Sequence, residues 1–174
     1  WDDVYGSAGR AAAAMSAAVP DVRLVTYRAK PLADAFQSLA NAYGLTIEGP
    51  SVRSEVAFDY FHPLATPRIT PRPDAIPQND AIRIEDDIVL RFGMLEGEAV
   101  VSASTAVYDP QSAYDPRPFG ENGSTAGRLA VILNQVEARR FADLPDATEA
   151  AKAILARGEA AVVVLKMGSR GALV

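Results

Sequence analysis

Two observations predict that the chain forms one domain with an α/β fold. Short runs rich in valine, isoleucine and leucine alternate with segments whose apolar residues recur at helical spacing, and this alternation is typical of a sheet covered by helices. The second observation is size, because 174 residues, 49% of them hydrophobic, are enough for one domain with a sizeable core. The sequence contains no internal repeat.

The first part of the chain alternates helix and strand. Small residues open an alanine-rich helix in YGSAGRAAAAM, and VRLVTY (22–27) has the character of a buried strand. PLADAFQSLANAYG predicts a helix that begins near Pro31 and stops at Gly44, since proline suits the first turn and glycine the end of a helix. The expected apolar face of this helix is Leu32, Phe36, Leu39 and Tyr43. LTIEG then predicts a short strand.

Residues from about 49 to 97 predict a small antiparallel sheet, inserted into the α/β unit as a lid. SEVAFDYFH alternates like a strand, a proline-rich stretch follows that cannot be a helix or a central strand, and AIRIEDDIVLRFGM returns to alternation. Phe58, Tyr60 and Phe61 either cover a sugar or base, or form the apolar face on which the small sheet rests. Asp86 and Asp87 are expected in a solvated turn.

The last part of the chain resumes the α/β rhythm. AVVSAS predicts a strand, and the proline-glycine loop after it begins near Asp109, which we expect to form a turn at the strand end. TAGRLAVILN predicts a core strand that ends at Asn134, and helices are expected over 135–142 and 147–157. AAVVVLKMG predicts another strand, and GALV the start of its hairpin partner.

Composition excludes several classes of protein. The chain has no cysteine, which excludes disulfides and thiolate metal sites and fits a cytoplasmic location. A net charge of −5, without a basic block carrying interleaved aromatic residues, argues against nucleic acid as a partner. The apolar runs are far shorter than the roughly 20 residues of a membrane helix, so no membrane partner is expected. The single histidine, His62, excludes a histidine-based metal cluster.

Two groups of residues suggest phosphate chemistry. Asn134 and Glu137 stand at i and i+3 where a strand meets a helix, and open α/β sheets bind ligands at the carboxyl ends of their strands. The same spacing also fits a capping box that only stabilises the helix. Lys166 precedes two glycines spaced three apart, a loop that can approach phosphate or form an ordinary hairpin. It is not a Walker A loop.

Two segments, in this order, resemble the ribokinase-like (PfkB) family of carbohydrate and nucleoside kinases. ILNQVEARRF is similar to the family's Asn-x-x-Glu element, which is associated with magnesium and phosphate. VVVLKMGSRGALV is similar to the family's strand and Gly-x-x-Gly hairpin beside the nucleotide. YGSAGRAAAAM looks like the family's sugar-contacting turn and helix, although Gly6-Ser7 replaces a double glycine and Arg10 stands where asparagine is common. The lid also matches in position.

The resemblance implies a ribokinase-like (Rossmann-like) three-layer sandwich with a small β-sheet lid, as a single incomplete domain over residues 1–174. It implies an ATP-dependent kinase, with ATP and Mg²⁺ as cofactors, that transfers the γ-phosphoryl group to a hydroxyl of a sugar or nucleoside. Residues expected on the nucleotide side are Asn134, Glu137, Lys166, Gly168 and Gly171, with Glu137 acting on Mg²⁺ through water. Residues expected on the acceptor side are Gly6, Gly9 and Arg10. Because lids pair between subunits in the family, the resemblance also implies a homodimer.

Two elements of the family fall outside these residues. An acceptor-binding aspartate would precede Trp1, and the Gly-Ala-Gly-Asp segment with the catalytic base would follow Val174. Because the chain also opens on Trp1 rather than methionine, we expect it to be part of a longer protein. One alternative is a catalytically incomplete kinase-like domain that binds a nucleotide or sugar as a sensor or assembly scaffold. A third hypothesis is an unrelated Rossmann-like binding domain.

Overall fold

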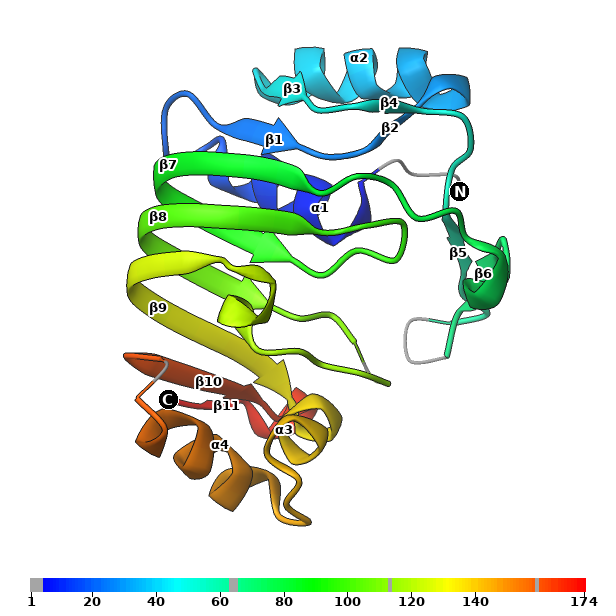
Figure 1. The fold of residues 1–174 in the computed structure, drawn as a ribbon. Coiled ribbons are helices and arrows are strands. Elements are labelled where there is room, and N and C mark those ends of the chain that lie inside the picture. The colour runs from blue at the N-terminus through cyan, green and yellow to red at the C-terminus, as the bar shows by residue number, and fades with distance from the viewer. Residues whose placement is uncertain (1–4, 63–65, 113, 159) are drawn as a thin grey trace. The chain divides into compact units, whose positions relative to one another are not determined.

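The computed structural model describes residues 5–62, 66–112, 114–158 and 160–174. The chain divides into two compact units, and Figure 1 labels their helices and strands. The first unit comprises Trp1–Ile82 with Leu95–Gly97, and the second comprises Arg83–Met94 with Glu98–Val174. Among the described residues, no helix combines the length and apolar character needed to cross a membrane.

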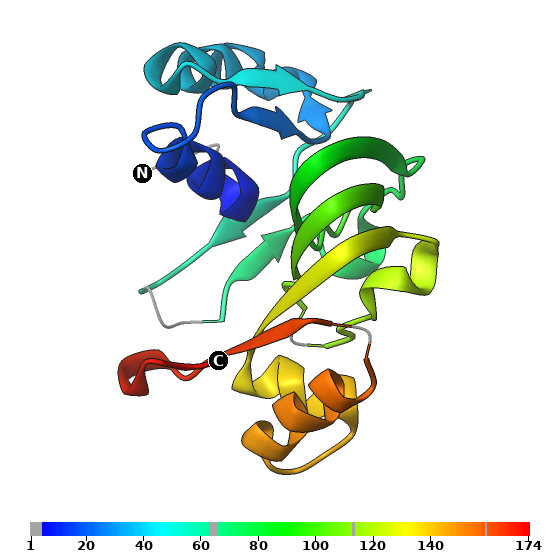
Figure 2. The same ribbon diagram turned by 90° about the vertical axis from the view of Figure 1, so that its left-hand side faces the viewer.

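In the first unit, a pair of parallel strands lies between two helices (Figures 1 and 2). The elements are β1 (Arg23–Val25), β3 (Thr46–Glu48), α1 (Gly6–Met15) and α2 (Ala33–Tyr43). A buried cluster joins them, made of Ala12, Leu24, Leu39 and Leu45. The predicted end of the second helix at Gly44 is confirmed, because Gly44 adopts the left-handed conformation (φ 65°) in which glycine has no steric penalty.

The rest of the first unit consists of short elements. They are β2 (Arg28–Ala29), β4 (Ser51–Val52), β5 (Ala57–Asp59), β6 (Arg68–Thr70) and the 3-10 turns η1 (Lys30–Leu32) and η2 (Pro73–Ala75). β2 pairs with β4 in parallel, whereas β5 and β6 form an antiparallel pair with Phe58 opposite Ile69. An antiparallel pair therefore occurs in the segment where the sequence predicts a lid, and the lid's bounds stay a prediction.

The second unit is built on a five-stranded sheet in the order β11-β10-β9-β8-β7. Its strands are β7 (Ile82–Phe92), β8 (Ala99–Asp109), β9 (Thr125–Asn134), β10 (Val162–Lys166) and β11 (Ala172–Leu173). β8, β9 and β10 run parallel to one another, and β11 is antiparallel to β10. The predicted hairpin at the end of the chain is thus confirmed, with Lys166 opposite Ala172.

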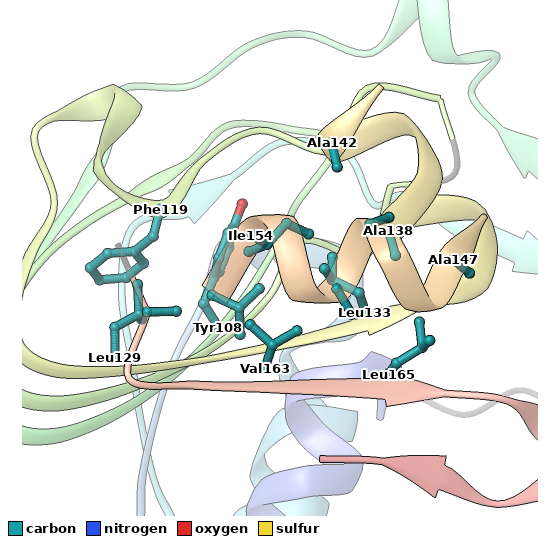
Figure 3. Close-up of a cluster of buried hydrophobic side chains, with 14 of the residues drawn as sticks. Tyr108, Phe119, Leu129, Leu133, Ala138, Ala142, Ala147, Ile154, Val163 and Leu165 are labelled. Atoms are coloured by element: carbon teal, nitrogen blue, oxygen red, sulfur yellow. The ribbon is translucent and has the colours of Figure 1, made fainter. Parts of the chain in front are cut away.

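Two helices cover one face of β9 and β10 (Figure 2). They are α3 (Gln135–Ala142) and α4 (Ala147–Ala156), at the positions that the sequence predicts. Figure 3 shows Ile154 and Ala138 of these helices packed over Leu133, Val163 and Leu165 of the strands. Burial of a side chain as large as leucine or isoleucine stabilises the fold by roughly 1.5–3 kcal/mol. The small alanines on both helices allow them to approach the sheet closely.

The loop after β8 folds back onto the strand that precedes it. The Tyr108 hydroxyl donates to the Arg117 carbonyl at 3.1 Å, and the Tyr108 ring packs against Phe119 of the 3-10 turn η3 (Phe119–Asn122) at 5.5 Å between centroids. The Arg91 guanidinium lies over both rings and donates to the Phe119 carbonyl. These contacts fix the end of β8, where Asp109 is the last residue.

The structure corrects the interpretation of Asp86 and Asp87. The sequence analysis expects them in a solvated turn, but they lie in the middle of β7, with exposed side chains. The prediction is wrong because an exposed strand tolerates charged residues in succession, and the Asp87 carboxylate accepts a hydrogen bond from Ser104 of the neighbouring strand at 3.2 Å. Within residues 49–97, β7 therefore belongs to the five-stranded sheet.

Candidate functional site

The carboxyl ends of three neighbouring parallel strands meet at one edge of the sheet. β8 ends at Asp109, β9 ends at Asn134 and β10 ends at Lys166, with Asn134 directly opposite Lys166 in the register. Parallel strands place their carboxyl ends at the same edge, and ligands of open α/β sheets bind there. We call Asp109, Asn134, Glu137 and Lys166 the strand-end cluster.

An ion pair connects the two outer strands of this edge. The Lys166 ammonium donates to the Oδ2 atom of Asp109 at 2.6 Å, across the end of β9. The side chain of Asp109 is 7% exposed and that of Lys166 is 41% exposed. The other carboxylate oxygen of Asp109 accepts a hydrogen bond from the Gln111 backbone at 3.2 Å. The pair therefore leaves the lysine, and not the aspartate, accessible from solvent.

Asn134 and Glu137 form a complete capping box at the start of α3. The Asn134 side chain accepts from the backbone N–H groups of Val136 at 2.8 Å and Glu137 at 2.9 Å. In return, the Oε2 atom of Glu137 accepts from the Asn134 backbone N–H at 2.8 Å. The capping box that the sequence spacing allows is thus present, and both side chains stabilise the helix start.

Glu137 also has a raised pKa, because its side chain is buried. It is only 3% exposed, and this burial raises the pKa of its carboxyl group because a low-dielectric environment disfavours the charged form. The negative charge of Asp109 raises that pKa further, whereas hydrogen bonds from the backbone of Asn134 and Ser112 and the charge of Lys166 lower it. In addition to its role in the cap, Glu137 therefore interacts electrostatically with Asp109 and Lys166.

The loop after Lys166 is a tight turn beside the cluster. Its 3-10 turn η4 (Gly168–Arg170) is closed by a bond of 2.8 Å from the Met167 N–H to the Gly171 carbonyl. Gly168 and Gly171 have φ angles of 62° and 84°, which favour glycine. The Arg170 guanidinium donates to the Gln135 side chain in the first turn of α3 at 2.7 Å. This bond ties the loop to the helix start next to Asn134.

The predicted nucleotide-side residues all belong to the second unit, and the predicted acceptor-side residues all belong to the first. Asn134, Glu137, Lys166, Gly168 and Gly171 all lie in the second unit, around the ends of β9 and β10. The acceptor-side residues lie in the first unit, within the first turns of α1. There, Gly9 is buried while Gly6 and Arg10 are exposed. Their role stays a prediction.

Sequence reasoning found Asp109 but not its role at the site. It expected a turn at the strand end, which is confirmed by the bond from the Gln111 N–H to the Asp109 carboxylate. The ion pair with Lys166 was missed, because the two residues are 57 positions apart and only the parallel sheet brings them together. The signal in the sequence was an acid directly after an apolar strand, one residue before Pro110.

The aromatic residues of the predicted lid are exposed. Phe58, Tyr60 and Phe61 have 46%, 57% and 102% of their surface accessible. Phe58 lies in β5, opposite Ile69 of β6. Exposure on this scale does not fit the interpretation in which these rings form the apolar face that supports the small sheet, because such a face is buried. Whether they cover a sugar or a base stays a prediction.

Comparison with known proteins gives a fold but no close relative. No protein-family model matches the chain, and no curated protein matches it. Among solved structures, it is similar to a pyrophosphate-dependent kinase in the ribokinase family, complexed with a pyrophosphate analogue and myo-inositol. The TM-score is 0.51 at 14% identity, over 95% of this chain and 66% of that one.

A second solved structure is a pyrophosphate-dependent myo-inositol-1 kinase converted into a myo-inositol-3 kinase, with a TM-score of 0.46 and 13% identity. The match covers 89% of this chain and 59% of that chain. The sequence prediction of an α/β fold is confirmed by the five-stranded sheet and its helices, and the similarity to the first of these two structures confirms that the fold is ribokinase-like. The chain has a ribokinase-like fold.

Proposed function

We propose that this chain forms the phosphoryl-donor side of a kinase that transfers the γ-phosphoryl group of ATP to a hydroxyl of a sugar or nucleoside. The observation that carries the proposal is the convergence of Asp109, Asn134, Glu137 and Lys166 at the carboxyl ends of three parallel strands. Phosphoryl transfer depends on positioning and charge neutralisation more than on covalent chemistry, so a fixed set of charges at this edge suits it.

Each donor-side residue has a role that its geometry supports. Lys166, 41% exposed at the strand end, offers a positive charge to the phosphates. Gly168 and Gly171 let the backbone of the following turn approach the nucleotide, since neither carries a side chain. Asn134 and Glu137 hold the start of α3 at this edge through their capping box. The partial positive charge at a helix start favours phosphate groups.

The cluster fits magnesium as the donor's counterion. Its candidate ligands are oxygen atoms of Asn134 and Glu137, which are the hard donors that magnesium prefers. Within the described residues, no group of three or more acidic, histidine or cysteine side chains could hold a metal ion by itself. Magnesium commonly keeps several waters and binds through one or two carboxylates together with substrate phosphates. We therefore propose that Glu137 acts on Mg²⁺ through water, as the sequence analysis predicts.

The proposal includes a second donor and a class of acceptor. A kinase with the same fold is pyrophosphate-dependent and binds myo-inositol, so pyrophosphate and polyols belong among the compounds to be tested.

Three residues are proposed for the acceptor side because their segment resembles the family's sugar-contacting turn: Gly6, Gly9 and Arg10. The cytoplasmic location and the homodimer through the lid also stay proposals, and sedimentation equilibrium tests the homodimer.

Binding and turnover are tested separately. Calorimetric titration with magnesium–ATP and magnesium–pyrophosphate is expected to give saturable binding. Lys166→Met should weaken it, and Lys152→Met, which removes a lysine from an exposed ion pair on α4, should not. Product release is then measured over a panel of sugars, nucleosides and myo-inositol. Binding of neither donor by the wild-type chain, or binding indifferent to Lys166→Met, would contradict the proposed donor site.

A second candidate function is binding of the donor without turnover, as a sensor or assembly scaffold. Both acids of the strand-end cluster are already engaged, Asp109 with Lys166 and Glu137 in the capping box. Neither is therefore placed as a free base for an acceptor hydroxyl. Saturable donor binding with no product from any acceptor would favour this function. Acceptor-stimulated release of ADP or phosphate would favour the kinase.

A further inference from the structure

The carboxylate of Asp109 is buried and fixed by hydrogen bonds at both of its oxygen atoms. Its side chain is 7% exposed, and its two carboxylate oxygens accept from different elements, Oδ1 from the Gln111 N–H and Oδ2 from the Lys166 ammonium. Buried charges are retained in proteins when they are paired and hydrogen-bonded, which is the case here. The backbone carbonyl of Asp109 also accepts a bond of 3.0 Å from the Gly93 N–H.

The ammonium group of Lys166 keeps one position only if a partner group holds it. A lysine side chain has a flexible four-carbon stem, so its ammonium has no fixed position unless a partner provides one. The partner here lies on β8, whereas Lys166 lies on β10, so the ammonium is held across the end of β9. That position is next to the start of α3, where Asn134 and Glu137 lie.

We propose that Asp109 is a positioning residue, which fixes the Lys166 ammonium at the point where the donor phosphates bind. The proposal rests on the proposed function, in which Lys166 is the phosphate-binding cation. An ammonium has three donors, of which Asp109 accepts one, and the exposed part of Lys166 leaves the others to a ligand. Asp109 is covered and acts on the donor only through Lys166.

A double-mutant cycle tests this indirect action. The Kd for magnesium–pyrophosphate and magnesium–ATP is measured by calorimetry for wild type, Asp109→Asn, Lys166→Met and the double variant. We expect Asp109→Asn to raise Kd about threefold or more, because a mobile lysine must be ordered when the donor binds. In the Lys166→Met background the same substitution should leave Kd unchanged, since coupled residues are not additive. Asp115→Asn, in an exposed ion pair of the loop after β8, is the matched control.

Two results of the double-mutant cycle would contradict the proposed positioning role of Asp109. An equal rise of Kd in both backgrounds would mean that Asp109 acts on the donor directly, and an unchanged or lowered Kd in Asp109→Asn would mean that positioning contributes nothing. Either result overturns the proposal. If Asp109→Asn does not fold, Asp109→Glu enters the same cycle, because it keeps the charge and moves the carboxylate by one methylene.

A measurement without any donor separates this inference from the proposed function. If the wild-type chain binds neither donor, the proposed function fails, and NMR relaxation of the Lys166 Cε and Nζ atoms still reports how well the ammonium is ordered. Increased motion in Asp109→Asn, but not in Asp115→Asn, supports positioning. Unchanged order of Lys166 in Asp109→Asn overturns it.

Discussion

The ammonium of Lys166 lies 2.6 Å from the Oδ2 atom of Asp109, although the two residues are 57 positions apart in the sequence. The contact joins the ends of β10 and β8 and leaves the lysine partly open to solvent. It makes this edge of the sheet a place where a positive charge is both fixed and accessible. Four predictions test the site and its surroundings.

Lys166→Met should weaken donor binding strongly. A hydrogen bond to a charged group contributes about 1.5–3 kcal/mol, so we expect the Kd for magnesium–ATP or magnesium–pyrophosphate to rise about tenfold or more. Lys166→Arg should retain part of the affinity, because it keeps the charge. The affinity of the wild type should also fall with added salt more steeply than that of Lys166→Met. Equal salt dependence in both proteins would show that Lys166 does not face the donor.

Asn134→Ala should lower both stability and donor affinity. The lost cap is worth about 0.5–2 kcal/mol of unfolding free energy, measured by urea denaturation. Asp146→Ala removes the equivalent cap of α4, where the Asp146 side chain accepts from the N–H groups of Thr148 and Glu149. We expect a comparable loss of stability in that control but unchanged donor affinity. Equal loss of affinity in both variants would mean that only global stability matters.

Glu137→Gln should change how stability depends on pH. Burial raises the folded-state pKa of Glu137 above its ordinary value of about 4.5, so the folded protein holds this proton more tightly than the unfolded chain does. The resulting stabilisation is fully present below about pH 4.5 and is lost as the pH rises through the raised folded pKa. The variant lacks this group but keeps an amide oxygen for the Asn134 N–H.

The check is urea denaturation of both proteins at several pH values from 4 to 8. We expect the unfolding free energy of the wild type to fall relative to that of Glu137→Gln as the pH rises across this window. A wild type that gains stability relative to the variant would mean that the folded protein stabilises the Glu137 carboxylate. In that case the charges around it would outweigh its burial.

Gly93→Ala should disturb the end of β8. A Cβ atom at Gly93 would overlap the backbone carbonyl of Pro110, and the Gly93 N–H bonds to the Asp109 carbonyl. Forcing extra atoms into a packed position destabilises by about 1–3 kcal/mol, and we expect weaker donor binding because Asp109 must shift. Gly120→Ala is the control, since a Cβ there meets no atom within 4 Å. Similar loss in both variants would show that close packing at Gly93 is not the cause.

Local signals predicted much of the second unit. The predicted helix over 135–142 is confirmed with the same bounds, because Asn134 and Glu137 form a capping box that depends only on residues close in sequence. The strand predicted in AAVVVLKMG is observed as Val162–Lys166, and its hairpin partner is confirmed, since a hairpin also joins residues close in sequence. The first unit agrees less closely, since Tyr43, expected on the apolar face of its helix, is 40% exposed. Packing against other elements decides burial, and periodicity alone does not.

The position of a strand within a sheet was beyond local signals. Asp86 and Asp87 suggested a turn, because paired acids are frequent in solvated turns, yet β7 runs through both. A strand at the sheet's end can expose charged side chains to solvent, so charge does not interrupt it. Sequence alone also did not separate the last strand of the expected lid from the main sheet.

By itself, the sequence determined the α/β class, and it offered the capping box of Asn134 and Glu137 and the glycine turn after Lys166 as one interpretation of each segment. Each depends on side-chain and backbone preferences within a few residues, which a single chain displays directly. Only the tertiary structure decided that Asp109 meets Lys166 and that Glu137 is buried beside both. The parallel pairing of β8, β9 and β10 brings their carboxyl ends to one edge, and no local pattern specifies which strands will be neighbours.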